Sequence, residues 1–369
     1  MAGRRLNALV LGVGGNVSQS IQKALALGST PTRVVAACIS PHSPGLYVAD
    51  RAYISPLAAS PEFIPWLLDV CEREQIDVVL SGSEVVLDAL AREANAIHDQ
   101  TGAVCIVSPP DVLSIGRDKL LTCRWLEERG LPVPDYAGVF DEPAVRALVQ
   151  RRGFPLVAKP RFGKGGDGIV ILRDESDLGR LVAAEDLSLR EIVGRRLAAS
   201  DLILQQYLGS EHDEYTAGCF IDSNRRLRGT IVMRRKLLAG TTAVAELGRF
   251  DAVRDVAASV ATELAPLGPC NVQLRCHEGL AIPFEINPRF SGTTAMRARM
   301  GFNEVDAAVR HFGLGQPIED LTDVGSGVAL RYWNEVYVPA EAVRTAGERG
   351  YLVDPPSEKI TVEAWGFGP

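Results

Sequence analysis

The 369-residue chain lacks long hydrophobic runs, paired-cysteine motifs and an excess of positive charge. No apolar stretch approaches the roughly 18 residues of a membrane-spanning helix, so we expect no membrane association. Its seven cysteines are scattered without a C-x-x-C motif, which predicts neither a zinc site nor a disulfide framework and fits a reduced, cytoplasmic setting. A net charge of −7 and a pI near 5.4 argue against nucleic-acid binding through phosphate contacts.

The N-terminal third alternates hydrophobic runs with amphipathic segments. The run Leu6–Leu11 predicts a buried strand that ends in a Gly12-Val13-Gly14-Gly15 turn and is followed by a helix. Further predicted strands and helices alternate along the rest of this third. Strands that alternate with helices predict a doubly wound parallel α/β sheet. A dinucleotide-binding site is not predicted, because Val17 replaces the third glycine of that fingerprint.

The stretch Ser108-Pro109-Pro110 interrupts regular secondary structure and suggests the end of this first domain. We therefore predict an N-terminal domain over residues 1–112.

A glycine-rich turn follows the predicted strand Leu156–Pro160, which carries Lys159 near its end. Its segment RFGKGGDG holds Gly163, Lys164, Gly165 and Gly166. Backbone N–H groups in such a turn can converge on phosphate oxygens, and Lys164 adds a positive charge. The segment is not a Walker P-loop, since Ala158 and Gly165 occupy two of the motif's fixed positions. The alternative is a hairpin tip without a ligand.

A β-hairpin is predicted over residues 271–289, NVQLRCHEGLAIPFEINPR. Glu285 and Asn287 are two residues apart on one strand and must share a face. We expect a three-residue loop, His277 to Gly279, with Gly279 in the left-handed conformation. In that register Leu280 pairs with Cys276, and Gln273 joins Glu285 and Asn287 on the same face.

The other face of this hairpin would then be apolar, formed by Val272, Leu274, Ile282, Phe284 and Ile286. Three oxygen-bearing side chains on one face suit a hard cation such as Mg²⁺. The alternative is a polar strand end that faces solvent. Further expected elements are a helix over 111–130 that carries Lys119, a strand headed by Glu214, a helix over 251–264 and a strand over 328–338.

Taken together, these segments resemble the ATP-grasp superfamily, and within it the branch of the carbamoyl-phosphate-synthase large subunit. The resemblance rests on GVGGNVSQSI, GRDKLLTCRWLEERGLPVP, PLVAKPRFGKGGDGIVIL, ILQQYLGSEHDEYTAGCFID and NVQLRCHEGLAIPFEINPRFSGTTA. It implies an N-terminal α/β domain over residues 1–112 and a second part over residues 113–208 that includes a small, mobile, glycine-rich lid. Residues 209–369 would form a C-terminal α+β part with an antiparallel sheet, and ATP would be held between lid and body.

The resemblance also implies a role for each matching residue. Lys119 and Lys159 would contact the nucleotide phosphates, and Gly163, Lys164, Gly165 and Gly166 would close over them. Gln205, Gln206 and Leu208 would meet the adenine, and Glu214 the ribose. Gln273, Glu285 and Asn287 would hold magnesium, with two ions expected and Mn²⁺ as a substitute. Arg289 would face the acyl phosphate, and Arg289, Lys159 and Lys164 would be the catalytic residues.

Two positions depart from the superfamily pattern. Gln205 stands where the hinge usually opens with Glu, which weakens the expected adenine contact. Gln273 is often Glu elsewhere in the superfamily, although the carbamoyl-phosphate-synthase branch carries Gln. With one negative charge fewer, such a site would depend more on phosphate oxygens and water for its metals.

The resemblance implies an ADP-forming ligase that converts a carboxylate into an acyl phosphate and couples it to an amine. One alternative is the activation of bicarbonate or carbamate, although carbamoyl-phosphate synthesis uses duplicated ATP-grasp halves and this chain holds one copy. A second alternative is a non-catalytic nucleotide-binding regulatory protein. The expected partners are small-molecule acids and amines, and a homodimer is an expectation from the family.

Overall fold

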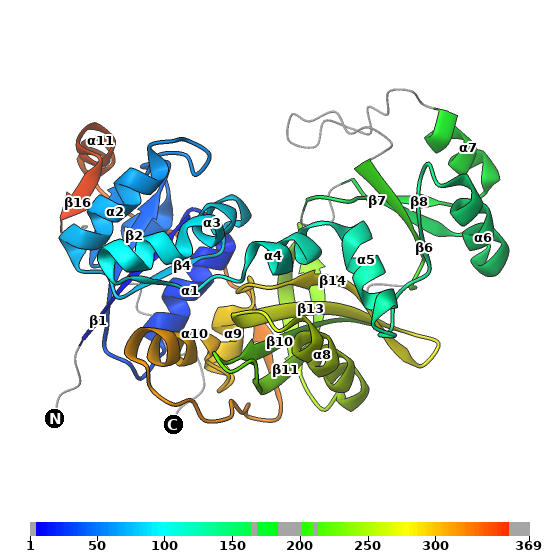
Figure 1. Cartoon of the computed structure of the whole chain (residues 1–369). Coiled ribbons are helices and arrows are strands. Elements are labelled where there is room, and N and C mark those ends of the chain that lie inside the picture. Colours follow the sequence, from blue (N-terminus) through cyan, green and yellow to red (C-terminus); the bar gives the residue numbers. More distant parts are fainter. Residues whose placement is uncertain (1–4, 164–167, 184–200, 210–212, 354–369) are drawn as a thin grey trace. The chain divides into compact units, whose positions relative to one another are not determined.

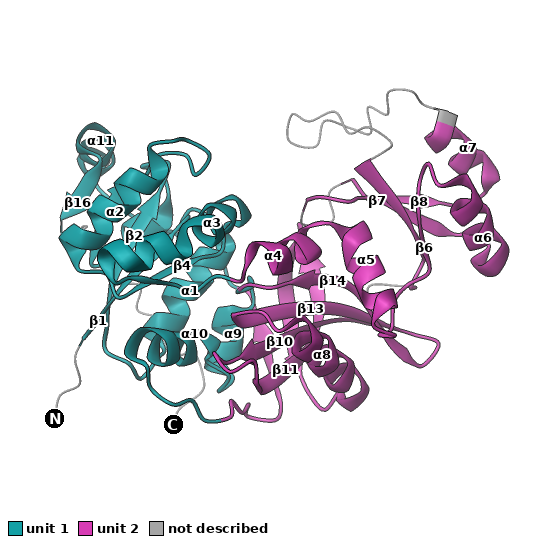
Figure 2. Cartoon of the chain, viewed as in Figure 1, with its two compact units in different colours: residues 1–107, 290–319, 332–369 teal, residues 108–289, 320–331 magenta. Residues whose placement is uncertain are grey.

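The computed structural model of the chain describes residues 5–163, 168–183, 201–209 and 213–353. The chain divides into two compact units (Figure 2). Unit 1 comprises residues 1–107, 290–319 and 332–369, and unit 2 comprises residues 108–289 and 320–331. The three-part division at residues 112 and 208 stays a prediction. Among the described residues, no helix combines the length and hydrophobicity needed to cross a bilayer.

Unit 1 is built on a six-stranded sheet with the order β16-β3-β2-β1-β4-β5 (Figure 1). The pairs of β1 with β2 and β4, of β2 with β3 and of β4 with β5 are parallel, and only β16 pairs antiparallel, with β3. Its strands are β1 (Leu6–Leu11), β2 (Thr32–Cys38), β3 (Arg51–Ile54), β4 (Val78–Ser81), β5 (Val104–Cys105) and β16 (Tyr351–Val353). The predicted doubly wound parallel sheet is therefore confirmed.

The glycine turn after β1 has a steric reason. Gly12 adopts a positive φ of 72°, and a Cβ atom there would lie 3.2 Å from the Cβ of Ser83. A side chain would therefore meet both backbone strain and crowding. The helical segments of unit 1 are α1 (Asn16–Ala26), η1 (Pro44–Leu46), α2 (Phe63–Glu74), α3 (Glu84–Thr101), α9 (Thr294–Arg299), α10 (Glu304–Ala308), the π-helical η4 (Val309–Gly313) and α11 (Ala340–Arg349).

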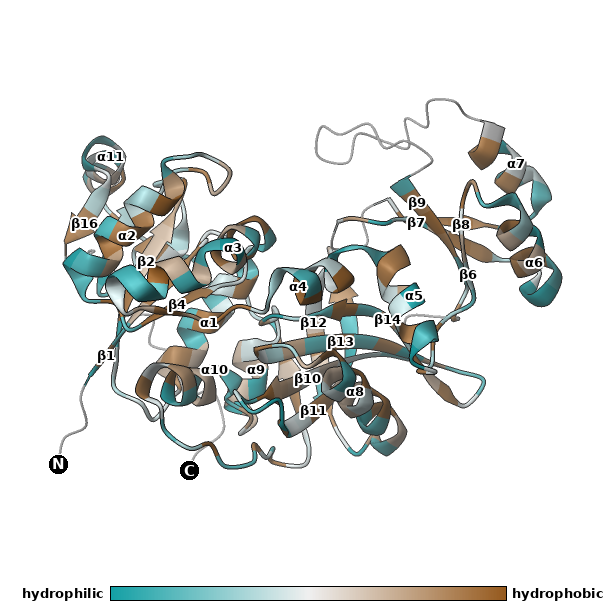
Figure 3. Ribbon diagram, viewed as in Figure 1, coloured by the Kyte–Doolittle hydropathy of each residue, from teal (hydrophilic) through white to brown (hydrophobic). Residues whose placement is uncertain are grey.

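A four-stranded antiparallel sheet in unit 2 has the order β6-β9-β7-β8. Its strands are β6 (Tyr136–Gly138), β7 (Leu156–Pro160), β8 (Val170–Leu172) and β9 (Leu202–Gln206), and its helices are α6 (Glu142–Arg152) and α7 (Glu175–Ala183). Both helices combine hydrophobic and hydrophilic residues (Figure 3). Leu156 and Ala158 of β7 belong to the core that also holds Leu148 and Leu181. By strand alternation, Lys159 then points to the opposite face of this sheet.

The second sheet of unit 2 is antiparallel, with the order β14-β13-β10-β11-β12-β15. Its strands are β10 (Glu214–Ile221), β11 (Leu227–Leu238), β12 (Thr241–Leu247), β13 (Gly268–His277), β14 (Leu280–Asn287) and β15 (Gly327–Leu330). Helix α8 (Asp251–Leu264) covers one face, where Ala217, Val272 and Ile286 pack against Ala257 and Val260. Residues one position away along these strands therefore point to the other face, which carries the candidate site.

The hairpin β13–β14 forms, but the predicted register is wrong. The turn contains two residues, Glu278 and Gly279, and His277 pairs with Leu280. Both turn residues have positive φ, 50° and 79°, as type I′ hairpin turns require, and the predicted left-handed Gly279 is confirmed. A two-residue turn alone would place Gln273 on the wrong face. A β-bulge at Phe284 inserts one extra residue, so that Gln273 pairs with Glu285.

The bulge also changes which side chains form the apolar face. Leu274 pairs with Pro283, and Ala281 packs in the core beneath the sheet. Ile282 pairs with Arg275 and lies on the site face. The ring of Phe284 lies 5.3 Å from Nζ of Lys159, so Phe284 also belongs to the site face. The prediction that Ile282 and Phe284 face the core is therefore wrong.

The predicted helix over 111–130 is two helices, α4 (Pro110–Arg117) and α5 (Lys119–Glu128). Between them Asp118 leaves the helical conformation, and its side chain accepts hydrogen bonds from the backbone N–H groups of Leu120 and Leu121. Asp118 is therefore the N-cap of α5, and this cap places Lys119 at the first helical position.

The strand predicted over 328–338 is shorter than expected, because β15 ends at Leu330. Its partner strand is β12, and the last paired residues are Leu330 and Val244. Since β12 begins at Thr241, it offers few further residues to pair with. Beyond β15, Tyr332 and Tyr337 are more than four-fifths exposed, at 83% and 85%.

Candidate functional site

Three oxygen-bearing side chains meet at the middle of β13 and the end of β14, and we call Gln273, Glu285 and Asn287 the metal face. Nε2 of Gln273 donates a hydrogen bond of 3.1 Å to Oε1 of Glu285. Nδ2 of Asn287 donates to the same oxygen at 2.9 Å. The structure thus brings together the three residues that the sequence grouped, while their role as metal ligands stays a proposal.

The carboxyl group of Glu285 is strongly influenced by the cations around it. Burial by itself would raise its pKa. The charges of Lys119, Arg235 and Lys159, together with the hydrogen bond from Asn287, outweigh burial and hold the pKa below its ordinary value. Glu285 is therefore a carboxylate at neutral pH, which is the form that binds a divalent cation.

Glu214, at the start of β10, is buried and clamped by two arginines. Its Oε1 accepts from Nη2 of Arg235 at 2.6 Å, and its Oε2 accepts from Nη2 of Arg275 at 2.7 Å. The same Nη2 of Arg235 also donates to Oε1 of Gln273 at 2.7 Å. Arg235 therefore connects the predicted ribose ligand to the metal face.

Two further cations border the metal face. Nη2 of Arg289 donates to Oδ1 of Asn287 at 2.9 Å. Lys159, on β7, is only 7% exposed, and its ammonium group lies over the ring of Phe284. Burial lowers the pKa of Lys159 to about 8. Lys159 is thus a strongly desolvated cation close to Glu285, as a phosphate-binding lysine would be.

Lys119 lies at the first position of α5, and its Nζ donates to the carbonyl oxygen of Gly163 at 3.1 Å. The backbone N–H of Lys119 donates to the carbonyl oxygen of Arg161 at 3.0 Å, and Arg161 forms an ion pair with Asp118. These contacts join Lys119 to the start of the glycine-rich turn. The remaining predicted members of that turn, Lys164, Gly165 and Gly166, lie outside the described residues.

The predicted adenine hinge includes two glutamines whose side chains point into the protein. Nε2 of Gln205 lies 3.0 Å from Sγ of Cys123, and Oε1 of Gln206 accepts from the backbone N–H of Asp135 at 3.3 Å. Both glutamines are buried, and so is Leu208, which follows the end of β9. An adenine at this hinge would therefore meet the backbone after β9, and this contact stays a proposal.

The metal face can be tested for its fit to magnesium. Within the described residues, no cluster of three His, Cys, Asp or Glu side chains could hold a metal. The donor set here is one carboxylate with two amide oxygens, which suits a hard cation that completes its shell with phosphate oxygens and water. The hydrogen bonds of Gln273 and Asn287 fall on a single oxygen of Glu285. The metal face therefore fits Mg²⁺ once Arg235 releases the amide oxygen of Gln273 and Arg289 releases that of Asn287, since these oxygens can then bind the ion.

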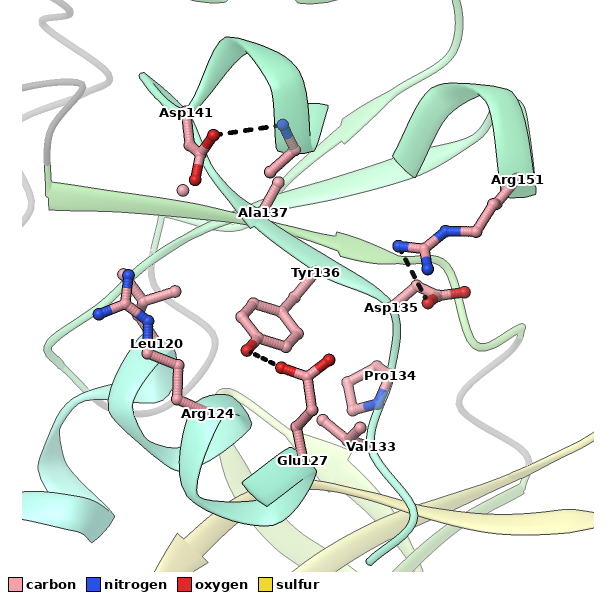
Figure 4. A pocket seen from close by; sticks show the side chains of 12 residues that line it. Leu120, Arg124, Glu127, Val133, Pro134, Asp135, Tyr136, Ala137, Asp141 and Arg151 are labelled. Carbon is pink, nitrogen blue, oxygen red and sulfur yellow. Dashed lines mark hydrogen bonds and ion pairs between the residues drawn. The ribbon is translucent and has the colours of Figure 1, made fainter. Parts of the chain in front are cut away.

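A separate pocket of about 270 Å³ lies elsewhere in unit 2, between α5, β6 and α6 (Figure 4). In it the hydroxyl of Tyr136 donates to Glu127 at 2.6 Å, and Arg151 pairs with Asp135. None of the predicted site residues is among the described residues that line this pocket. We therefore do not place the chemistry there.

Sequence reasoning missed three residues of the site. Arg235 and Arg275 were not singled out, and Phe284 was expected on the apolar face. Strand alternation separates Arg235 from its neighbour Arg234: Arg234 is exposed and pairs with Glu246, whereas Arg235 faces the site. The position of Phe284 depends on the bulge, for which the sequence carries no clear signal.

Two family models match the chain. Residues 8–105 match a model described as the PylC-like N-terminal domain, and residues 198–336 match a model described as ATP-grasp in the biosynthetic pathway with the Ter operon. Among characterised proteins, the chain is 22% identical over 320 residues to the carbamoyl phosphate synthase large chain of Kocuria rhizophila. That alignment covers 83% of this chain but 28% of the relative, so the chain spans less than a third of the synthase's length.

Solved structures agree on the fold. The N5-carboxyaminoimidazole synthetase of Staphylococcus aureus in complex with ADP has a TM-score of 0.68 at 16% identity, covering 89% of this chain and 83% of that one. The biotin carboxylase domain of Hydrogenobacter thermophilus 2-oxoglutarate carboxylase, in complex with MgADP, ADP and bicarbonate, has a TM-score of 0.67 at 16% identity, covering 89% and 75%. The predicted fold is confirmed, and the matches to an ATP-grasp family model and to carbamoyl phosphate synthase large chains bear out the resemblance that the sequence motifs indicated.

Proposed function

We propose that this protein is an ADP-forming ligase that activates a carboxylate with ATP and couples it to an amine. The observation that carries the proposal is the metal face itself: in unit 2 an ionised Glu285 lies among two amides, the buried Lys159 and the guanidinium of Arg289. Phosphoryl transfer needs positioning and charge neutralisation more than covalent help from the protein, and these groups supply both.

In this proposal each residue acts on a part of the nucleotide. Lys119, Lys159 and the turn of Gly163 to Gly166, with Lys164, hold the phosphates. The backbone around Gln205, Gln206 and Leu208 holds the adenine, and Glu214 holds the ribose. The ADP-bound and MgADP-bound relatives support nucleotide binding by this fold. The finer division into an N-terminal domain, a lid part and a C-terminal part follows residues 1–112, 113–208 and 209–369.

The chemistry has two steps. A carboxylate oxygen of the acid attacks the γ-phosphorus of ATP, the bond to the β-phosphate oxygen breaks, and ADP leaves. The amine nitrogen then attacks the acyl carbon, inorganic phosphate leaves, and the nitrogen loses a proton to solvent. In this proposal Arg289 binds the acid's carboxylate through paired N–H groups and stabilises the oxyanion of the second step.

Gln273, Glu285 and Asn287 would hold the metal, for which we propose two Mg²⁺ ions with Mn²⁺ as a substitute. When bound, these ions neutralise the phosphate charge and orient the γ-phosphoryl group. Lys159 adds a positive charge at the same place. Because Lys159 is desolvated, its attraction for a phosphate is stronger than that of a surface lysine.

A second candidate reaction is the activation of bicarbonate, and two comparisons favour it. The biotin carboxylase relative is solved with a bicarbonate anion, and the sequence relatives are carbamoyl phosphate synthases. In this version the acyl phosphate is carboxyphosphate, and the amine acceptor becomes carboxylated. Both reactions use the same residues to bind the nucleotide, and they differ in the acid that ATP phosphorylates.

The test is ADP release measured over a matrix of carboxylic acids, bicarbonate and amines. Turnover that requires both an acid and an amine supports the ligase, and turnover that requires bicarbonate supports the second candidate. Tight nucleotide binding without turnover on the whole matrix would favour a regulatory protein instead.

The setting of the reaction is also part of the proposal. We place it in the cytoplasm, because all seven cysteines are free thiols in the structure, and six of them are buried. We propose small-molecule substrates and a homodimer. The biotin carboxylase relative was solved as a dimer, which supports this assembly.

A further inference from the structure

The amide oxygens of the metal face are each held by an arginine. Oε1 of Gln273 accepts from Arg235 at 2.7 Å, and Oδ1 of Asn287 accepts from Arg289 at 2.9 Å. These oxygens are the atoms that a divalent cation would need. A cation that approached them would meet a guanidinium at hydrogen-bond distance from each ligand atom, and like charges repel strongly where solvent is excluded.

The charge around the metal face disfavours a bare cation. In the described part of the site, two carboxylates lie among five cationic side chains: Glu214 and Glu285 among Lys119, Lys159, Arg235, Arg275 and Arg289. Such a site attracts a nucleotide polyphosphate and repels a free divalent ion. Metal affinity should therefore appear only after the phosphates have added their negative charge.

Arg235 is the residue best placed to link the two events. Its side chain is 10% exposed, and its Nη2 contacts both Glu214 and Gln273. Glu214 also holds Arg275, so it keeps one cationic partner if Arg235 moves. A phosphate oxygen is a strong acceptor for a guanidinium, so a bound polyphosphate could draw Arg235 away from Gln273.

We propose that Arg235 is a positioning residue that occupies the metal face until nucleotide binds, and so makes metal binding depend on nucleotide. This inference rests on the proposed function, because it assumes that Gln273, Glu285 and Asn287 bind the metal. Linkage requires the reverse effect as well: bound metal should raise the affinity for nucleotide by the same factor.

The test is a Mn²⁺ titration followed by electron paramagnetic resonance, which counts free Mn²⁺ and needs neither acid nor amine. Without nucleotide, the wild-type protein should bind Mn²⁺ weakly. Arg235→Gln removes the charge and should bind nucleotide-free Mn²⁺ at least about tenfold more tightly. Arg235→Met is a second neutral variant in case Gln is not tolerated, and circular dichroism checks that each variant is folded.

The matched control is Arg234→Gln. Arg234 is the adjacent residue on the same strand, but it is exposed and pairs with Glu246 on the other face, so its loss should leave Mn²⁺ affinity unchanged. Tight binding of Mn²⁺ to the nucleotide-free wild type would overturn the inference, as would equal Mn²⁺ affinity in wild type and the folded neutral variants. A separate titration with ADP tests the proposed function itself: if the wild type does not bind ADP, the proposed function is wrong.

Discussion

Gln273 and Glu285 lie directly opposite each other on β13 and β14, joined by a hydrogen bond of 3.1 Å, because Phe284 forms a bulge between them. Without that extra residue, the two-residue turn at Glu278 and Gly279 would place these side chains on opposite faces of the sheet. A local irregularity in one strand thus assembles the metal face. The same bulge brings the ring of Phe284 beneath the ammonium group of Lys159.

Glu285→Gln should abolish ADP formation while leaving much of the nucleotide affinity. The substitution keeps the shape of the side chain but removes the only carboxylate of the metal face, and a lost metal contact typically costs several kcal/mol of transition-state stabilisation. We expect at least about a 100-fold fall in the rate of ADP formation. Steady-state kinetics and equilibrium binding of ADP would measure the two effects separately.

The control for this variant is Glu278→Gln on the same hairpin. Glu278 lies in the turn with its side chain 72% exposed, so its loss should change neither ADP formation nor ADP affinity. Equal loss of activity in both variants would mean that the effect is structural and not specific to the metal face.

Nucleotide affinity should fall as pH rises above about 8. Burial lowers the pKa of Lys159 to about 8, so this lysine loses its proton in the free protein above that pH. In the proposed site the nucleotide phosphates bind the protonated lysine, so binding should weaken by up to about tenfold per pH unit above this value. ADP affinity measured from pH 6 to 10 would locate the inflection, and Lys159→Met should bind more weakly and lack it. An unchanged inflection in Lys159→Met would assign it to another group.

The same depressed pKa has a consequence for folding. Between about pH 8 and the unfolded value of 10.5 the unfolded chain binds more protons at Lys159 than the folded chain does. Stability should therefore rise with pH across this window, by up to about 3 kcal/mol from this group alone. Urea unfolding of wild type and Lys159→Met at both ends of the window would measure the difference. A wild-type stability that does not rise relative to Lys159→Met would contradict the desolvated lysine.

Gly279→Ala should destabilise the protein by roughly 1 kcal/mol through backbone strain alone. Gly279 has a φ of 79°, and an added Cβ atom would meet no atom within 4 Å, so crowding plays no part. The matched control is Gly179→Ala in α7, an equally open position where φ is not positive. There the substitution should be neutral or stabilise the helix by up to about 1 kcal/mol. A destabilised Gly179→Ala, or an unaffected Gly279→Ala, would contradict the turn geometry.

Asp118→Ala should cost about 1 to 2 kcal/mol at neutral pH, because it removes the cap of α5 as well as the partner of Arg161. Burial alone would raise the pKa of Asp118, but hydrogen bonds from Arg161 and the backbone of Leu120 hold it below 3.8. A lowered pKa stabilises the fold above the unfolded value, so the effect of the substitution should shrink as pH falls below 3.8. Urea unfolding at neutral and acid pH would measure this change.

The control is Asp141→Ala. Asp141 is the N-cap of α6, and its side chain accepts a hydrogen bond from the backbone N–H of Ala144. Its effect on stability should be smaller, because Asp141 is exposed. Asp118→Ala should in addition lower nucleotide affinity, since Asp118 positions Lys119. If the two variants bind ADP equally well, Asp118 does not position the nucleotide site.

The sequence predicted those features that depend on periodicity and on residue type. Alternating hydrophobic runs predicted β1, β2 and β4, and the amphipathic pattern over 251–264 gave both ends of α8 correctly. Glu285 and Asn287 share a face because they are two residues apart in a strand, and no tertiary knowledge was needed for that.

Features that depend on a single local irregularity were not predictable. The β-bulge at Phe284 leaves no mark in hydrophobic alternation, so the correct grouping of Gln273 with Glu285 followed from a wrong register. Residues 331–338 are rich in the aromatic and β-branched residues typical of strands, but β12, the strand with which they would pair, begins at Thr241. The arginine contacts of Glu214 join β10, β11 and β13, and such pairings between strands require the sheet order.

We propose that the metal face would hold divalent ions together with the phosphates of ATP, and the most direct test is a crystal structure with Mn²⁺ and a non-hydrolysable ATP analogue. Anomalous scattering locates Mn²⁺ without ambiguity. We predict an anomalous peak in contact with Glu285 and Asn287 and with the analogue's phosphate oxygens, with Lys159 against the same phosphates. An analogue bound elsewhere, or a Mn²⁺ peak away from Glu285, would contradict the account.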